Sequence, residues 1–387
     1  MYNPSNIHGI NKILNYLLRS STFGQKEWNQ STKAIFFNHR TKNARHILHS
    51  PFSNNISAAM STNTIRQPAE TKEVINPSKP LVVIGSANAE IYFEIDKLPK
   101  LGETISTNSS QILVGGKGVN QAACGGKLCY PTYFIGHIGD DTNGKLIKEA
   151  LMSNGVLLDY LNIVSSAPTG HALMVLDQSD GKNSIINVGG ANMCLWPKEL
   201  SNDILEVVKN AGIVLLQREI PDSVNIQVAK AARNAGVPVL MDAGGMERPT
   251  PVELLCLVDI LISNETELKN LTGMPTDSYE DISQAAAKCQ EMGVKKVLVK
   301  RGEKGSVLYV EGEEAIRQLP ISTGNILDTT GAGDTFTAAF AVALVEGKSE
   351  EECLTFAAAA ASLCIQVQGA MPSMPERKAV LNVLQSL

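Results

Sequence analysis

The sequence predicts an α/β protein with a central, mostly parallel sheet, helices on both faces and a small β-sheet lid. Three observations lead to this fold class. The chain has 387 residues, of which 43% are hydrophobic, so it can bury a large core. From Leu81 onward, short apolar runs alternate with amphipathic segments, as in repeated βαβ units. Two stretches in which polar and apolar residues alternate interrupt this pattern and predict exposed hairpins.

The central sheet is predicted from apolar runs that are short and nearly continuous in hydrophobicity. Strands of this kind are covered by helices on both faces. Helical patterns lie between them, and a clear one begins at Pro221 and Asp222 and ends at Gly236. The predicted strands are 81–85, 132–139, 213–217, 237–243, 259–264 and 296–300.

The lid is predicted from the two alternating stretches, at about 89–115 and 170–190. Turn signals lie within each of them, Leu98-Pro99 in the first and Asp180-Gly181 in the second. We expect the two hairpins to form one small sheet over one end of the central sheet. Residues 78–387 contain no linker and no repeat, so they predict a single domain that includes this lid.

Composition and charge argue against several classes of function. The net charge is −5 and the pI is about 5.8, which gives no general reason to bind nucleic acid or anionic lipid, although a local basic patch stays open. The seven cysteines form no CxxC pair and have no histidine at zinc-like spacing, which is typical of reduced thiols in an intracellular protein. No apolar run reaches the roughly 18 residues that a membrane-spanning helix needs. We therefore expect neither a membrane nor a nucleic-acid partner.

Residues 1–77 differ from the rest of the chain. Residues 1–68 contain eight Lys or Arg and a single acid, Glu27, in a background rich in Asn and Ser. A basic, acid-poor leader of this kind is typical of an organelle transit peptide. The alternative is a disordered extension without a targeting role. A plastid (chloroplast) leader is favoured over a mitochondrial one, and a second start at Met60 would leave the product in the cytoplasm.

The stretch around Asp334 carries the chemistry. Gly331, Ala332 and Gly333 come directly before this aspartate, and an apolar run that predicts a buried helix follows it. Small residues let backbone amides converge at a helix N-terminus, where an anion binds readily. A carboxylate beside a transferring phosphoryl group can accept the proton of an attacking hydroxyl, which predicts a phosphotransferase. The alternative is that Asp334 serves only the dipole of its own helix.

The glycine-rich segments of the chain exclude two common classes of nucleotide-binding motif. None fits the GxxxxGK[ST] pattern of a P-loop, and none has the context of a dinucleotide-binding GxGxxG. "DTTGAGDTF" and "GGKGVNQAA" resemble the two signatures of the ribokinase-like (PfkB) carbohydrate kinases. "GSANAE", "LLQREIP", "ISNETE" and "VKRGEKGS" resemble further elements of that family in the same order. The resemblance runs from about Pro80 to Leu387, and together with the leader it is closest to eukaryotic, plant-type members.

The resemblance implies a reaction and a sugar site. Asp334 would be the base, with Gly331, Ala332 and Gly333 forming an anion hole, in an in-line transfer of the γ-phosphate of ATP to the 5-hydroxyl of D-ribose. The lid would close to exclude water. Without the resemblance, Lys117 would be interpreted as a solvated lysine of a loop. The resemblance implies that the sugar meets Asn88, Ala89, Glu90, Gly116, Lys117, Gly118, Val119, Asn120, Glu219 and Asp334.

The nucleotide and the metal ions are likewise implied by the resemblance. Glu267 would lie near the phosphates and Mg²⁺, although "NETE" on its own would be an ordinary helix start. Asp328 would help to hold K⁺, or else cap a turn. The implied nucleotide site comprises Asn264, Lys300, Arg301, Gly302, Glu303, Lys304, Gly305, Gly333 and Ala358. The implied K⁺ site comprises Asp328, Thr330, Cys364, Val367, Gly369 and Ser373.

Glu90 is one departure from the family pattern. Its members that act on ribose usually carry Asp at this position, and the extra methylene moves the carboxylate by roughly 1.5 Å. The substrate could therefore also be a deoxypentose, another pentose or a nucleoside. A second alternative is that the chain is a catalytically silent regulator. The open edges of the predicted lid favour a homodimer in which two lids pair.

Overall fold

Six strands of the central sheet form at the six predicted apolar runs. The computed structural model describes residues 79–107, 109–177, 183–246, 248–322 and 324–387. The leader predicted at 1–77 and the turn predicted at Asp180-Gly181 lie outside these residues. The strands of this sheet are β1 (Leu81–Ile84), β4 (Thr132–Gly139), β5 (Leu161–Val164), β8 (Ile213–Arg218), β9 (Val239–Gly245), β10 (Ile260–Asn264), β11 (Lys296–Lys300), β12 (Ser306–Val310) and β13 (Ile316–Gln318).

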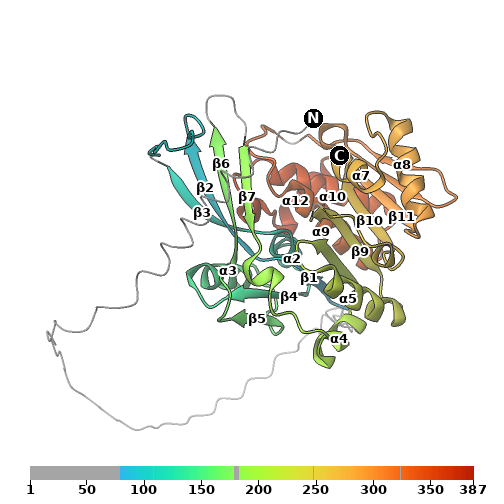
Figure 1. The fold of residues 1–387 in the computed structure, drawn as a ribbon. Coiled ribbons are helices and arrows are strands. Elements are labelled where there is room, and N and C mark those ends of the chain that lie inside the picture. The colour runs from blue at the N-terminus through green and yellow to red at the C-terminus, as the bar shows by residue number, and fades with distance from the viewer. Residues whose placement is uncertain (1–78, 108, 178–182, 247, 323) are drawn as a thin grey trace, which may run out of the picture. The chain divides into compact units, whose positions relative to one another are not determined.

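Within the described residues these strands form a nine-stranded sheet in the order β13-β12-β11-β10-β9-β8-β1-β4-β5 (Figure 1). Pairing is parallel from β11 through to β5, and it is antiparallel between β11 and β12 and between β12 and β13. The predicted fold class is confirmed. β5, β12 and β13 were not predicted. β5 and β13 are partly exposed edge strands without a continuous apolar run, and no α-helix separates β12 from β11 or β13.

Helices cover both faces of the central sheet because successive residues of each strand point in opposite directions. In β1, for example, Leu81 and Val83 pack into one core cluster, and Val82 and Ile84 pack into the other. On the first face lie α2 (Lys117–Lys127), α3 (Thr142–Ser153), α9 (Ala332–Val345), α10 (Glu350–Cys364) and α12 (Arg377–Gln385). On the second face lie α4 (Asn202–Lys209), α5 (Asp222–Asn234), α6 (Val252–Leu255), α7 (Glu265–Thr272) and α8 (Tyr279–Glu291).

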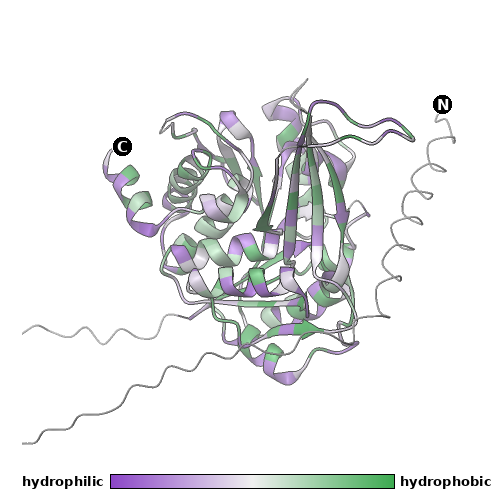
Figure 2. Cartoon of the chain, turned by 90° about the vertical axis from the view of Figure 1, so that its left-hand side faces the viewer, coloured by the Kyte–Doolittle hydropathy of each residue, from purple (hydrophilic) through white to green (hydrophobic). Residues whose placement is uncertain are grey.

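A separate small sheet forms from the two alternating stretches. Its strands are β2 (Asn88–Ile95), β3 (Ser110–Gly115), β6 (Gly170–Asp177) and β7 (Asn183–Val188), in the order β3-β2-β6-β7. Hydrophilic and hydrophobic residues are interleaved along these strands (Figure 2). Ile112, Ile185 and Ile186 of this sheet are each more than half exposed. This sheet is the element that was predicted as the lid.

Two further observations bear on the sequence predictions. All seven cysteines are free, and Cys124, Cys289, Cys353 and Cys364 are buried. Among the described residues, no helix has both the length and the apolar character that crossing a bilayer requires.

The remaining short elements are α11 (Ala370–Ser373) and the 3₁₀ turns η2 (Gly190–Met193) and η3 (Gly302–Lys304).

Candidate active site

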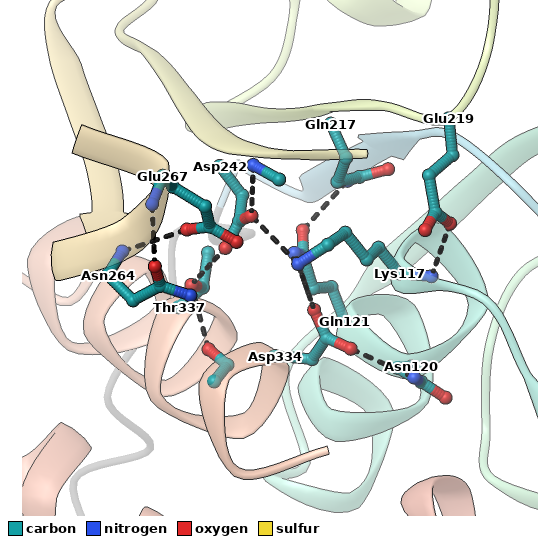
Figure 3. Close-up of polar contacts among 12 residues, drawn as sticks. Lys117, Asn120, Gln121, Gln217, Glu219, Asp242, Asn264, Glu267, Asp334 and Thr337 are labelled. Atoms are coloured by element: carbon teal, nitrogen blue, oxygen red, sulfur yellow. Dashed lines mark hydrogen bonds and ion pairs between the residues drawn. The ribbon is translucent and has the colours of Figure 1, made fainter. Parts of the chain in front are cut away.

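Polar side chains gather where parallel strands of the central sheet end. Because β1, β8, β9, β10 and β11 are parallel, their carboxyl ends share one edge of the sheet. α2 and α9 contribute their first turns at the same place, and Figure 3 shows their side chains facing those of the strand ends. Polar residues near the carboxyl ends of these strands or just after them include Ser86, Gln217, Glu219, Asp242, Asn264 and Lys300.

The first turn of α9 needs a glycine before it and presents two backbone amides that have no acceptor among the described residues. Gly331 has φ of 80°, in the left-handed region that favours glycine, and a Cβ there would lie 2.9 Å from the Cα of Ala370. The amide of Ala332 donates to the carbonyl of Thr329 at 3.2 Å. In the described part of the chain, the amides of Gly333 and Asp334 have no protein acceptor. These two N–H groups, at the positive end of the helix dipole, can bind an anion.

Asp334 lies in this turn, and its carboxylate faces α2. Asn120 Nδ2 donates to Asp334 Oδ2 at 2.9 Å, and Gln121 Nε2 donates to Oδ1 at 3.2 Å. Lys117 Nζ is 3.9 Å from Oδ1. Burial raises the pKa of Asp334, whereas the ammonium group of Lys117 opposes that rise. Both oxygens are used by α2, so Asp334 does more than complement the dipole of its own helix, and its raised pKa suits a general base.

Lys117 is held in the site rather than solvated. Its Nζ donates to Asp242 Oδ1 at 2.9 Å, and its backbone amide donates to Glu219 Oε2 at 3.0 Å. Burial alone would lower the pKa of Lys117, but Asp242 and Asp334 keep it well above its ordinary value. The ammonium group is therefore charged and is placed between two carboxylates from different elements.

Asp242 is a central residue of the site that the sequence analysis missed. It is completely buried, and its carboxylate accepts hydrogen bonds from Lys117, Lys300, Thr337 and the amide of Gly244. Burial alone would raise its pKa, but the two lysines hold that pKa well below the usual range. A carboxylate at the end of the buried strand 237–243 was the available signal.

The predicted sugar residues from α2 and β8 lie around Asp334. Asn120 is buried, and in the described residues its Oδ1 has no protein partner, so this acceptor is available to a ligand. Glu219 also accepts a hydrogen bond from the hydroxyl of Ser86. Gly118 packs against the backbone of Ser86, and Gly116 and Val119 flank this segment at the start of α2.

The predicted sugar residues of β2 approach from the small sheet. Asn88 Oδ1 accepts a hydrogen bond from Asn192 Nδ2 at 2.7 Å, and Ala89 is buried. Glu90 Oε2 accepts a hydrogen bond from the hydroxyl of Tyr92 at 2.9 Å. Burial raises the pKa of Glu90, and the bond from Tyr92 opposes that rise. Asn192 and Tyr92, which orient these two side chains, were not foreseen from the sequence.

The predicted nucleotide segment follows β11. Lys300 points its ammonium group toward Asp242, and a Cβ added to Gly333 would lie 3.2 Å from Lys300 Nζ. Arg301 turns away, because its guanidinium stacks on the ring of Tyr279 at 3.8 Å and pairs with Glu265. Gly302, Glu303 and Lys304 form η3, Gly305 follows it, and Ala358 is partly buried in α10.

Asn264 and Glu267 form a capping box at the start of α7. The amide of Glu267 donates to Asn264 Oδ1, and the amide of Asn264 donates to Glu267 Oε2, each at 2.8 Å. The other carboxylate oxygen of Glu267 faces inward, since a Cβ added to Gly244 would lie 2.5 Å from Oε1 and 2.6 Å from Lys117 Nζ. Glu267 therefore does cap the start of α7, as the ordinary interpretation held, and its Oε1 faces the site.

The residues predicted to hold K⁺ lie together at the other side of the first turn of α9. Asp328 Oδ1 accepts a hydrogen bond from the amide of Thr330 at 2.9 Å, and its Oδ2 accepts one from Gly369 at 2.8 Å. Cys364 Sγ lies 3.0 Å from Ser373 Oγ. Asp328 thus caps a turn, as the alternative interpretation held, and it also brings the loop of Val367 and Gly369 next to α9.

Comparison with known proteins decides the family. The sequence model of the pfkB family carbohydrate kinases matches residues 78–377. The chain belongs to this family. The pfkB kinases similar to it include a ribokinase from Arabidopsis thaliana, 64% identical over 332 residues, which are 85% of this chain and 86% of the relative. They also include a deoxyribokinase from Salmonella typhi, 30% identical over 295 residues, which are 76% of this chain and 95% of the relative.

Solved structures of pfkB kinases share the fold. The structure of Arabidopsis thaliana ribokinase complexed with ribose and ATP matches with a TM-score of 0.78 and 66% sequence identity, covering 80% of this chain and 99% of that one. The family and the fold predicted from the glycine-rich motifs are therefore confirmed.

Proposed function

We propose that this chain transfers the γ-phosphate of ATP to the 5-hydroxyl of D-ribose, giving D-ribose 5-phosphate. The observation that carries the proposal is the first turn of α9, where Asp334 lies beside Lys117 and beside two backbone amides that have no acceptor among the described residues. The 64% identity to a ribokinase and the similarity to a structure complexed with ribose and ATP support ribose and ATP as the substrates.

Each group of the site has a separate role in the proposed reaction. Asp334 accepts the proton of the attacking hydroxyl, because its carboxylate is buried and has a raised pKa. The amides of Gly333 and Asp334 stabilise charge that develops on the transferring phosphoryl group. The free Oδ1 of Asn120 accepts a sugar hydroxyl, and carboxylates such as Glu219 accept others. The small sheet closes over the sugar and excludes water, which would otherwise compete with it.

Mg²⁺ fits the donors that the site offers. Among the described residues, no group of three or more His, Cys, Asp and Glu side chains is placed to hold a metal ion. Oε1 of Glu267 faces the site as a single carboxylate oxygen, and Mg²⁺ is commonly held by one or two carboxylates with phosphate and water oxygens. The ion would supply positive charge to the phosphate oxygens, and Glu267 would orient it.

K⁺ fits the second group of donors. The carboxylate of Asp328, the hydroxyl of Ser373 and nearby backbone carbonyls are hard oxygen donors of low total charge. The site adjoins Gly331, so an ion there would fix the turn that presents the free amides. Asp328, Thr330, Ser373 and carbonyls of Cys364, Val367 and Gly369 would hold it.

The test of the proposed function is turnover of the full chain with D-ribose, ATP and Mg²⁺, followed by ADP release. We expect ribose to be the best substrate in a panel with 2-deoxyribose, other pentoses, fructose and adenosine, and turnover to be at least about fivefold higher in potassium than in sodium. Preference for 2-deoxyribose would support a deoxypentose as the substrate, an alternative that Glu90 and the similarity to a deoxyribokinase suggest. Absence of turnover with every sugar would support a silent regulator.

The exposed edge strands and exposed isoleucines of the small sheet favour a homodimer. Ile112, Ile185 and Ile186 are more than half exposed there, and β3 and β7 are edge strands whose backbone groups could pair with a second copy. We expect sedimentation at micromolar concentration to give a dimer. The substitution Ile185→Lys should shift it toward monomer, whereas Leu387→Lys, at an exposed residue outside this sheet, should not. A wild-type chain that sediments only as monomer would contradict the dimer.

The basic, acid-poor composition of residues 1–68 supports a transit peptide within residues 1–77, with the plastid as its destination. A mitochondrial leader, or a cytoplasmic product that starts at Met60, is the alternative. The location of a fluorescent fusion to residues 1–77 distinguishes the three.

A further inference from the structure

Asp242 joins two lysines that come from opposite sides of the site. Lys117 opens α2 and donates to Asp242 Oδ1, and Lys300 ends β11 and donates to Oδ2, each at 2.9 Å. The amide of Gly244 and the hydroxyl of Thr337 complete the bonds of this carboxylate. Asp242 has no exposed surface, so its side chain can reach a substrate only through these partners.

The two ammonium groups lie at different parts of the first turn of α9. Lys117 Nζ is 3.9 Å from the carboxylate of Asp334, beside the base. Lys300 Nζ lies 3.2 Å from the position of a Cβ on Gly333, beside the free amides. Within the described residues, Asp242 is the hydrogen-bond partner of Lys300 Nζ, and an ammonium group has three donors. Lys300 therefore has donors left for a ligand anion.

The charges of the site explain why these lysines need to be fixed. Asp334, Asp242, Glu267, Glu219 and Glu90 bring carboxylates toward the place where a polyanionic nucleotide must bind. An unrestrained Lys117 could pair with Asp334, Glu267 or Glu219, and an unrestrained Lys300 could pair with Asp334. Because Asp242 binds both lysines in a water-poor environment, it gives each a single position and keeps Lys117 from pairing fully with Asp334.

We infer that Asp242 is a positioning residue that holds Lys300 beside Gly333, where the Lys300 side chain binds the terminal phosphate of the nucleotide, and holds Lys117 beside Asp334. The inference deepens the proposed function and rests on its nucleotide being a triphosphate. The family resemblance already placed Lys300 in the nucleotide site, and the inference assigns its side chain to the terminal phosphate. Asp242 acts through the lysines and touches no reacting atom.

The experiment compares Lys300→Met, Lys300→Arg, Asp242→Asn and the double variant Asp242→Asn/Lys300→Met in the full chain. Asp259→Asn is the matched control. Asp259 accepts hydrogen bonds from Lys295 at 2.6 Å and from the amide of Val239 at 3.0 Å, at the opposite end of β9 from Asp242. Removing its charge breaks an aspartate–lysine pair of the same sheet without touching the site. Melting temperature is measured for every variant.

Binding separates the contact with the terminal phosphate from general damage. We expect Lys300→Met to weaken binding of the Mg²⁺ complex of β,γ-methylene-ATP by about 10-fold and that of Mg-ADP by less than about threefold, and Lys300→Arg to restore part of the loss. Equal weakening of both nucleotides, or of neither, would overturn the assignment of Lys300. This readout needs no sugar turnover, so it decides the inference even if ribose is not the substrate.

Kinetic coupling tests the positioning role of Asp242. We expect Lys300→Met and Asp242→Asn each to lower kcat by about 30-fold, and the double variant to be at most about fivefold worse than either, because both remove the same positioned cation. If the two losses instead multiply, so that the double variant loses about 1,000-fold in kcat, Asp242 does not act through Lys300. Asp259→Asn should change melting temperature but change kcat by less than about twofold. If Asp242→Asn does not fold, the nucleotide comparison on Lys300→Met and Lys300→Arg still decides the contact.

Discussion

Replacing Asp334 by Asn is expected to lower kcat by at least about 100-fold, because it removes the base that accepts the proton of the attacking hydroxyl. The substitution keeps the size of the side chain, and the new amide oxygen can still accept a hydrogen bond from Asn120 or Gln121. The binding of Mg-ADP should therefore stay within about threefold of wild type. Turnover is measured by ADP release under saturating ribose and ATP.

The pH profile gives an independent check on the same residue. Burial raises the pKa of Asp334, and the carboxylate must be ionised to act, so kcat/KM should fall with falling pH through a pKa above the ordinary aspartate value. This acid limb should be absent from the residual activity of the Asn variant. The charged and titratable groups that face Asp334 are Lys117, Lys300, Asp242, Glu90, Cys124 and Cys364. Near-normal turnover of the variant, or an unchanged acid limb, would contradict the assignment of the base.

The parts of the fold that the sequence predicted are those with a local signal. A buried parallel strand such as 81–85 is continuous in hydrophobicity, and α5 is bounded by Pro221 and Gly236, so each can be recognised without its neighbours. β12 and β13 lack that signal, since they form an antiparallel edge whose outer strand is partly exposed. The small sheet was foreseen from alternation, but its parallel pair, β2 with β6, joins segments far apart in the chain.

The site was predictable where a motif presents backbone groups, and less so where side chains meet across the sheet. Gly331 and Gly333 mark the first turn of α9 within a few residues of Asp334. Asp242 had no comparable motif, because its role depends on Lys117 and Lys300, which lie 125 residues before it and 58 residues after it. Lys117 taken alone resembles a solvated lysine for the same reason. Its charge is recognised as part of the site only when Asp242 is placed beside it.

Replacing Gly118 by Ala is expected to cause the other large loss, because it separates α2 from β1. A Cβ at Gly118 would lie 2.6 Å from the amide nitrogen of Ser86 and 2.7 Å from its carbonyl oxygen, and backbone atoms cannot rotate away as side-chain ends can. α2 must shift, and it carries Lys117 and Asn120 with it. We expect the free energy of unfolding to fall by about 3 kcal/mol and kcat/KM to fall by about 100-fold. Thermal unfolding and steady-state kinetics measure the two effects.

Gly236→Ala separates the steric effect from the general cost of replacing a glycine. Gly236 has φ of 71°, and no atom lies within 4 Å of the position of its added Cβ. The substitution should cost about 1 to 2 kcal/mol through backbone strain and leave kcat/KM unchanged, since Gly236 precedes the amino end of β9, whereas the site lies at the carboxyl ends of the strands. A Gly118→Ala variant that unfolds no more easily than Gly236→Ala, and keeps normal kcat/KM, would show that α2 can move without disturbing the site. It would then follow that the close contact between α2 and β1 does not set the position of Lys117.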